Sequence, residues 1–159
     1  MMAEGLNQEQ ISKAKTAVFR FLKIRLRSEQ EIAEKLKIKK FDKNIIKETI
    51  RYFKDIELIN DRVFAKAWIR SRLNKPFGFG RIKNELKTKG VAEDILQEEF
   101  ENIKSDDYQE SEIVLKAAQR RASVYKNVDP LKLKQRLLGY LTRRGFSSES
   151  IYKALKKIK

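Results

Sequence analysis

Apolar residues along this chain recur with a helical period and do not alternate as in a strand. They come in pairs separated by two residues, such as Ala17-Val18 followed by Phe21-Leu22. Positions i, i+1, i+4 and i+5 lie on one side of a 3.6-residue turn. The pattern therefore predicts an all-α chain, with helices near residues 8–26, 29–39, 42–55, 61–74, 79–89, 92–104, 107–126, 130–144 and 147–158.

This pattern occurs three times, and each copy ends in an arginine: Arg25, Arg72 or Arg121. A second block follows each copy, and its members also correspond: Leu36…Lys39-Lys40-Phe41, Leu86…Lys89-Gly90-Val91 and Leu141…Arg144-Gly145-Phe146. The period is near 50 residues. Tandem repeats of this length are supersecondary units that bury their open faces by stacking on one another.

The spacing predicts three repeats of three helices each, over residues 1–58, 59–104 and 105–159. We expect a tandem array of these repeats with an elongated, curved shape. Two departures affect local packing only: Lys40 stands where the other repeats have glycine, and Ala117-Ala118 stand where bulkier residues would be typical.

Signals at the predicted helix ends support this division. Ser28 and Glu31 have the spacing of a capping box, Asp42 and Ser147 are good N-caps, and Asp129 precedes a first-turn proline. Gly90 and Gly145 stand where helices should end, each after a basic residue.

Composition narrows the class of protein. Apolar residues make up 41% of the chain, enough for a core, and charged residues 37%. No apolar run approaches a membrane span and no signal peptide is evident, so we expect a cytoplasmic protein without membrane contact. The chain has neither Cys nor His, which removes disulfides, the usual metal and haem ligands and the commonest acid–base catalyst. We expect no catalytic residues, no metal and no cofactor.

Net charge is +15, unevenly distributed. Residues 62–89 hold nine basic side chains against one acidic, residues 93–112 one against nine, and residues 113–159 thirteen against two. Basic segments favour a polyanionic partner or assembly. The acidic stretch could contact a basic partner surface, pair with the chain's own lysines or stay hydrated.

Two interpretations of the repeated arginines are open. Each arginine could pair with a nearby carboxylate such as Glu31 or Glu85, or interact favourably with the negative C-terminal end of its own helix. Alternatively, the three could form a row of anion-binding groups. The repeated aromatic residues Phe21, Phe64 and Trp68 are expected in the core, since base stacking would require exposure.

The segment from Pro76 to Arg81 resembles a phosphate loop only superficially, because it lacks both the Walker frame and a preceding strand. We interpret it as an elbow between helices in which Gly78 and Gly80 allow positive φ. Lys75, Arg81 and the loop amides could still bind an anion.

Two helices joined by a glycine turn also invite comparison with a helix-turn-helix that reads DNA. The second helix would begin with Glu93 and Asp94, whose carboxylates phosphates repel, and the third repeat lacks the Arg, Asn or Gln expected for base readout. Sequence-specific DNA binding is therefore the weaker interpretation.

Motifs of the central repeat resemble those of the RecX family, the bacterial regulators of the RecA recombinase. The relevant residues are Asp61-x-x-Phe64-Ala65-x-x-Trp68-Ile69-x-x-Arg72, Gly78 and Gly80, then Arg81-Ile82-x-x-Glu85-Leu86-x-x-Lys89-Gly90-Val91. In the first repeat, Arg25-Leu26-Arg27-Ser28-Glu29-x-Glu31-Ile32-x-x-Lys35-Leu36 is also similar to RecX. The resemblance extends over residues 12–157.

The resemblance implies a non-enzymatic regulator that binds RecA and its filament on single-stranded DNA. It further implies inhibition of ATP hydrolysis, strand exchange and co-protease activity in recombination and DNA repair. Basic side chains of the central and last repeats are the candidate contacts: Arg70, Arg72, Lys75, Arg81, Lys83, Arg120, Arg121, Arg143 and Arg144.

The competing hypothesis is a stand-alone helical DNA-binding protein, transcriptional or architectural. A nonspecific contact with single- or double-stranded DNA fits the basic charge under either hypothesis. We expect a monomer, because a stacked array buries its faces within one chain.

Overall fold

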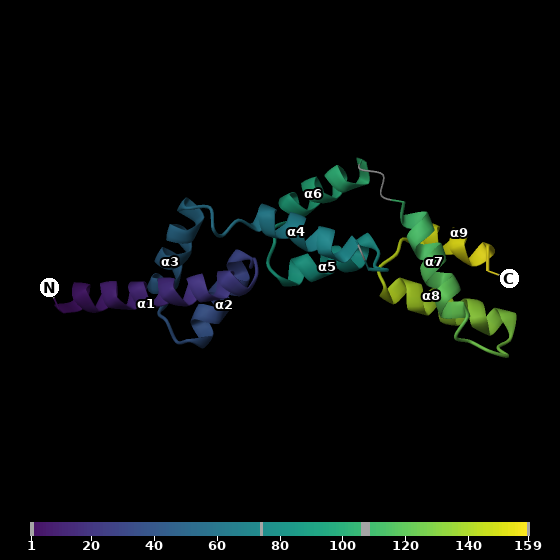
Figure 1. Cartoon of the computed structure of the whole chain (residues 1–159), viewed down its shortest axis with the longest axis horizontal. Helices are drawn as coiled ribbons and strands as arrows, with labels where there is room; N and C mark the ends of the chain where they lie inside the picture. Colours follow the sequence, from purple (N-terminus) through teal and green to yellow (C-terminus); the bar gives the residue numbers. More distant parts are fainter. Residues whose placement is uncertain (1, 74, 106–108, 159) are drawn as a thin grey trace. The chain divides into compact units, whose positions relative to one another are not determined.

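The computed structural model describes residues 2–73, 75–105 and 109–158, and these residues form nine α-helices and no strand (Figure 1). The all-α prediction and the three helices per repeat are confirmed. The helices are α1 (Met2–Ile24), α2 (Glu29–Ile38), α3 (Lys43–Asp55), α4 (Asp61–Leu73), α5 (Phe79–Thr88), α6 (Glu93–Ser105), α7 (Glu110–Ala122), α8 (Pro130–Arg143) and α9 (Ser148–Lys156). Within the described ranges, none is long and apolar enough to cross a membrane.

Two helices differ clearly from their predicted limits. α1 begins at Met2, six residues before the predicted start, in a segment with no capping signal. α7 ends at Ala122 and not at residue 126, because the chain turns there: the Tyr125 amide donates to the Ala122 carbonyl at 2.9 Å, and Asn127 adopts a φ of 55°. The predicted residues 107 and 108 lie outside the described ones.

The chain separates into two compact units that divide the middle repeat between them. Unit 1 comprises Met1–Lys66 with Lys87–Ile95, and unit 2 comprises Ala67–Leu86 with Leu96–Lys159. Each unit therefore holds one complete outer repeat and part of the central one. The three-repeat boundaries stay a prediction.

In unit 1, α1, α2 and α3 pack against one another (Figure 1). Their apolar faces enclose Val18, Ile32, Leu36 and Phe53, all without exposed surface. At about 25 cal/mol per Å² of apolar surface removed from water, this burial is the main stabilising contribution.

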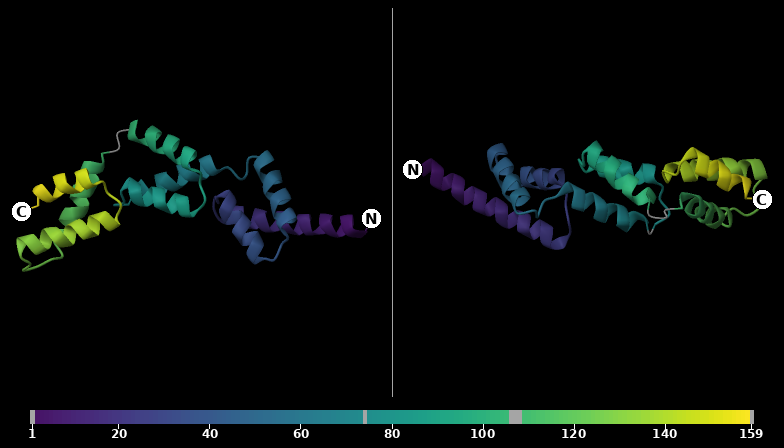
Figure 2. Two further views of the ribbon diagram at one scale, coloured as in Figure 1. Left: turned by 180° about the vertical axis from the view of Figure 1, so that it is seen from behind. Right: turned by 90° about the horizontal axis from the view of Figure 1, so that it is seen from above.

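In unit 2, α7, α8 and α9 lie side by side in the views of Figures 1 and 2. The core contains Val114, Leu137 and Leu141, together with Ala117 and Ala118. Small side chains at these two alanines suit a close approach of helices, and α7 packs extensively on α9.

The predicted N-caps are confirmed with one difference. The side chains of Ser28, Asp129 and Ser147 accept backbone N–H bonds from the first turns of α2, α8 and α9, whereas Asp42 makes no such bond. The capping box at Ser28 is half formed. The Glu31 amide donates to Ser28 Oγ at 3.1 Å, but the Glu31 carboxylate binds basic side chains.

Backbone conformation corrects the interpretation of the elbow. Gly90 and Gly145 adopt a φ of 78° and 77° after their helices, as their positions predicted. Gly78 and Gly80 do not have positive φ, so that prediction was wrong. Glycine is needed there because the backbone of Gly145 lies against the elbow: a Cβ on Gly78 would overlap the Gly145 carbonyl, and one on Gly80 would come within 3.0 Å of it.

Candidate interaction surface

All nine candidate contact residues belong to unit 2. Arg70 and Arg72 lie in the last turn of α4, Lys75 directly before the elbow, Arg81 and Lys83 in α5, Arg120 and Arg121 in the last turn of α7, Arg143 in the last turn of α8 and Arg144 at its C-cap. Among them Arg70, Lys75, Arg120 and Arg143 are exposed. Whether any of the nine contacts a partner stays a prediction.

A contact between two backbone turns brings the central and third repeats together. The Gly78 amide donates to the Arg144 carbonyl at 2.9 Å, and the Gly80 amide donates to the Gly145 carbonyl at 3.1 Å. The Arg144 guanidinium donates a hydrogen bond to the Pro76 carbonyl at 3.3 Å. We call this contact the second joint.

The aromatic ring of Phe77 lies at the same place. The guanidinium carbons of Arg81 and Arg144 stand 4.0 and 5.2 Å from its centroid, within the range of cation–π attraction. Candidate residues from α5 and from the α8 C-cap thus converge on one ring.

Arg72 and Arg81 share a carboxylate, that of Glu85. Arg72 Nε donates to Glu85 Oε2 at 2.7 Å, and Arg81 Nε donates to Oε1 at 3.1 Å. The indole of Trp68 also donates to Oε2, at 3.0 Å. Burial alone would raise the pKa of Glu85, but these hydrogen bonds outweigh it and lower the pKa. Both guanidiniums are therefore already engaged within the chain.

Arg25, in the first repeat, also binds a carboxylate. Its two terminal nitrogens donate to the two oxygens of Glu31 at 2.8 and 2.9 Å, and Lys89 Nζ donates to the same carboxylate at 2.8 Å. Burial alone would raise the pKa of Glu31, but the bonds from Arg25 and Lys89 lower it to about 2. For Arg25 and Arg72 the structure agrees with the first interpretation, in which each arginine pairs with a nearby carboxylate.

A contact analogous to the second joint connects the first repeat to the second, within unit 1. The Ser28 hydroxyl donates to the Lys89 carbonyl at 2.6 Å, beside the Lys89–Glu31 ion pair. We call this contact the first joint. Next to it, Asp61 accepts the Glu29 amide at 2.8 Å, and burial raises the pKa of the Asp61 carboxyl.

Arg121 has no ion pair among the described residues. Its guanidinium carbon lies 5.1 Å from the ring centroid of Tyr125 and 5.2 Å from that of Tyr140. Its Nε is buried and has no hydrogen-bond partner in the described chain. The arginine of the third repeat therefore lies beside aromatic rings, whereas Arg25 and Arg72 bind carboxylates.

A cationic groove of about 220 Å³ lies beside Tyr140. Lys75 and Arg120 line it, and so does Lys116, which the sequence analysis did not single out. Among the described residues, the ion pair of Lys116 is a long contact of 3.8 Å with the exposed Glu112. The groove thus joins two candidate residues with a third cation.

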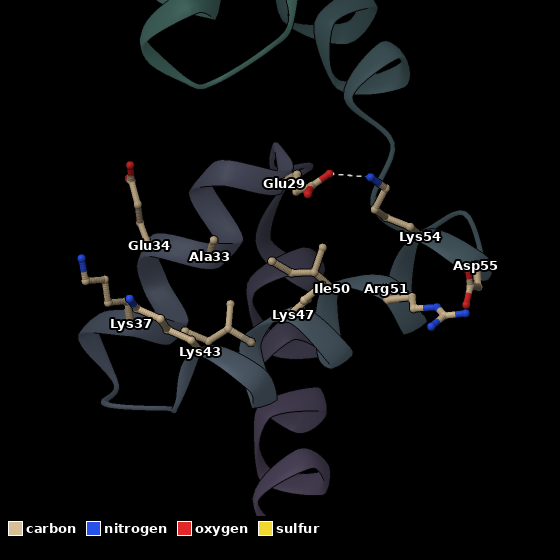
Figure 3. A pocket seen from close by; sticks show the side chains of 11 residues that line it. Glu29, Ala33, Glu34, Lys37, Lys43, Lys47, Ile50, Arg51, Lys54 and Asp55 are labelled. Atoms are coloured by element: carbon tan, nitrogen blue, oxygen red, sulfur yellow. Dashed lines mark hydrogen bonds and ion pairs between the residues drawn. The ribbon is translucent and has the colours of Figure 1, made fainter.

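A larger groove of about 600 Å³ lies between α2 and α3 in unit 1 (Figure 3). Its apolar surface includes Ala33, Ile46 and Ile50, and the Lys54–Glu29 ion pair at 2.7 Å lies at one end. Both signs of charge surround it, and no candidate residue lines it. Its chemistry suits an apolar side chain more than an anion.

The acidic stretch is used in part within the chain. Lys87 Nζ pairs with Glu93 at 2.8 Å, and the hydroxyls of Ser147 and Ser150 donate to Glu110 at 2.7 and 2.8 Å. Within the part of the chain that the structure describes, no cluster of acidic side chains is arranged to hold a metal ion.

Sequence reasoning missed Lys116, Tyr125, Arg136 and Tyr140. The signal was in the repeat alignment: Tyr140 stands at the position of Glu85, one residue before the leucine shared by all repeats. The sequence alone therefore shows that a tyrosine stands here in place of the carboxylate of the second repeat.

Comparison with known proteins matches each repeat to a family domain. The first, second and third three-helix domains of RecX match residues 14–53, 60–98 and 107–155. A regulatory protein RecX of Clostridium perfringens is 32% identical over 146 residues, covering 91% of this chain and 68% of that protein. One of Chlorobium phaeobacteroides is 35% identical over 147 residues, covering 92% and 93%.

Solved structures agree. The crystal structure of a regulatory protein RecX has a TM-score of 0.87 at 25% identity, covering 98% of this chain and 77% of that one. RecX from Lactobacillus salivarius has a TM-score of 0.81 at 26% identity, covering 95% and 97%. The chain therefore belongs to the RecX family of regulatory proteins.

Proposed function

We propose that this chain regulates the RecA recombinase by binding its filament on single-stranded DNA, and that it inhibits ATP hydrolysis, strand exchange and co-protease activity. The observation that carries this proposal is the match of three consecutive three-helix domains, in order, to the three RecX domains. We propose further that it acts without catalysis, as a monomer in the cytoplasm.

The contact surface we propose comprises the basic residues of unit 2. Arg72 and Arg81 are held by Glu85, so the exposed Arg70, Lys75 and Arg120 have more freedom to meet a partner. Exposed cations speed the encounter with an acidic assembly and make it salt-dependent. By linkage, such a ligand changes filament activity only if it binds one filament state more tightly than another.

The primary test follows ATP hydrolysis by RecA on single-stranded DNA as this chain is added. We expect turnover to fall with increasing protein and then to level off at saturation. Unchanged turnover at saturating protein would contradict the proposal.

A charge-reversal pair tests the contact surface. Lys75→Glu combined with Arg120→Glu should weaken inhibition about tenfold or more, because both side chains are exposed and line one groove. Lys23→Glu combined with Lys39→Glu makes the same charge change at exposed positions of the first repeat. Equal losses from both pairs would indicate a general charge effect and no localised surface.

Naked DNA distinguishes this function from that of a stand-alone DNA-binding protein. The first turn of α6 carries the exposed Glu93 and Asp94, which disfavour insertion into the major groove. We expect binding to mixed-sequence duplex to be weak and steeply salt-dependent. Tight, sequence-selective binding at moderate salt would support a direct reader of DNA instead.

A further inference from the structure

The repeated arginine has a carboxylate partner in two repeats. Arg25 binds Glu31 and Arg72 binds Glu85, with nitrogen–oxygen distances of 2.7–2.9 Å. Aligned on the shared leucine, Glu31 stands five residues before it and Glu85 one residue before it. These positions are four residues apart, so they lie on one face of the helix. Either position can present an anion to the arginine.

Neither position is acidic in the third repeat. Five residues before Leu141 stands Arg136, and one residue before it stands Tyr140. Between Ile113 and Ser148 the single acidic residue is Asp129, and its carboxylate accepts the Leu131 and Lys132 amides at the start of α8. Among the residues that the structure describes, no carboxylate therefore pairs with Arg121.

Two tyrosines and two further arginines surround the site. Besides Arg121, the guanidinium carbon of Arg136 lies 5.4 Å from the Tyr125 ring centroid, and that of Arg144 lies 4.9 Å from the Tyr140 ring centroid. We call these five residues the arginine–tyrosine cluster. Three guanidiniums share it, and none of the three forms an ion pair with a described carboxylate.

This arrangement leaves hydrogen-bonding capacity unused. Ring faces attract a guanidinium, but they do not accept the in-plane N–H bonds that a carboxylate would. The buried Nε of Arg121 is such an unused donor. An anionic oxygen at this place would satisfy it and relieve the repulsion among three like charges.

We propose that the arginine–tyrosine cluster receives a carboxylate side chain from a partner protein, which takes the place that Glu31 and Glu85 fill in the first two repeats. The first two repeats favour a carboxylate over a phosphate, because in each of them the corresponding arginine binds a carboxylate. The adjoining groove with Lys75, Lys116 and Arg120 would hold further acidic residues of the same segment. The proposal rests on the proposed function in one respect: RecA would be the partner.

Tyr140→Glu tests the proposal by supplying the missing carboxylate within the chain, as Glu85 does in the second repeat. The new side chain should bind Arg121, raise the melting temperature, and lower the affinity for RecA filaments about tenfold. Tyr152→Glu adds the same charge at an exposed position of α9 and is the control. It should stay within about threefold of the unsubstituted chain.

A second variant covers the case in which Tyr140→Glu fails to fold. Arg136→Glu places a carboxylate where Glu31 stands in the first repeat and should give the same loss of affinity. Its control is Lys134→Glu, an equal change of charge two residues away on an exposed part of α8. Equal affinity losses for Arg136→Glu and Lys134→Glu would overturn the proposal.

A probe that does not depend on RecA separates the two hypotheses. A fluorescent decaglutamate peptide should bind the full chain, and Tyr140→Glu should weaken this binding about tenfold while Tyr152→Glu should not. If RecA binding fails but this pattern holds, the proposed function is wrong and the carboxylate site stands. Decaglutamate binding that is absent, or unaffected by Tyr140→Glu, would overturn the site.

A single-stranded oligothymidylate completes the test. Its binding should be weak and equal for Tyr140→Glu and Tyr152→Glu, since nonspecific attraction depends on total charge. Selective loss of oligothymidylate binding in Tyr140→Glu, with decaglutamate binding unchanged, would identify the cluster as a phosphate site and overturn the proposal.

Discussion

The two joints are equivalent contacts. In each, the turn that contains the repeat's glycine lies against the start of the second helix of the preceding repeat. The two contacts are nevertheless built from different groups. Lys89-Gly90 meets the start of α2 through side chains, with Ser28 Oγ bonded to the Lys89 carbonyl and Lys89 Nζ bonded to Glu31. Arg144-Gly145 meets the elbow through backbone amides, those of Gly78 and Gly80. The first joint depends on ionisation and the second on the absence of side chains, so the two should respond to different perturbations.

The largest contrast should come from the two glycines of these turns. A Cβ on Gly145 would overlap the backbone nitrogen of Arg81, whereas the three atoms nearest to a Cβ on Gly90 belong to the side chain of Gln30. Both residues have positive φ, which disfavours alanine by about 1–2 kcal/mol. We expect Gly145→Ala to lower the free energy of unfolding by about 3–4 kcal/mol and Gly90→Ala by about 1–2 kcal/mol.

Urea denaturation measures this difference. Far-UV circular dichroism in urea follows the helices of both units, so it reports on Gly145 in unit 2 and on Gly90 in unit 1 alike. Gly145→Ala should shift the unfolding midpoint far more than Gly90→Ala does. Equal shifts would mean that the second joint tolerates a side chain, contrary to its geometry.

The next effect should be the pH-dependent contribution of the first joint. The folded-state pKa of Glu31, about 2, is below its ordinary value of 4.5. The ionised carboxylate therefore stabilises the fold above about pH 4.5, and this contribution is lost as pH falls toward 2. We expect Glu31→Gln to cost about 2 kcal/mol at pH 7, since two cations lose their partner.

Urea midpoints for Glu31→Gln and the unsubstituted chain should converge as pH is lowered from 4.5 to 2. Glu48→Gln is the control, because Glu48 is exposed on α3 and should change stability by less than about 0.5 kcal/mol. A cost for Glu31→Gln that is constant over this pH range would contradict the role of the ion pairs.

The helices could be predicted because their signals are local. Apolar spacing and caps such as Ser147 and Asp129 act within one turn of the chain, and they give the order and the approximate limits of the elements. The early start of α1 lacks such a signal. The role of Gly78 could not be predicted, because its neighbour Gly145 is 67 residues away and only folding brings the two together.

The basic charge of the candidate surface could be predicted, but the side chain that each arginine contacts within the chain could not. The repeat pattern identified Arg72 and Arg121 equally, yet Arg72 binds Glu85 and Arg121 lies beside two tyrosines. The pairing of Arg25 with Glu31 was among the stated alternatives. The bond from Ser28 to the Lys89 carbonyl could not be predicted, because any hydroxyl near any carbonyl fits the sequence equally well.

A smaller effect should come from the hydroxyl of the first joint. Ser28 Oγ accepts the Glu31 amide and donates to the Lys89 carbonyl, and the residue is fully buried. We expect Ser28→Ala to cost about 1–2 kcal/mol, independently of pH between 4.5 and 8, because no ionisable group is removed. Ser12→Ala, at an exposed position of α1, is the control. Parallel pH profiles for Ser28→Ala and the unsubstituted chain would separate this hydroxyl from the ion pair beside it.

The smallest effect should have the opposite sign. Lys40 occupies the glycine position of the first repeat with a φ of 64°, and its side chain is exposed. A non-glycine residue pays about 1–2 kcal/mol for this conformation, partly offset by the greater freedom of glycine in the unfolded chain. We expect Lys40→Gly to raise the free energy of unfolding by about 0.5–1 kcal/mol, measured by far-UV circular dichroism in urea. Lys39→Gly, one residue earlier and with negative φ, should instead destabilise the chain. If Lys40→Gly also destabilises, then the lysine side chain makes a contribution at this turn, and glycine in the other two repeats would have to be explained by the joints alone.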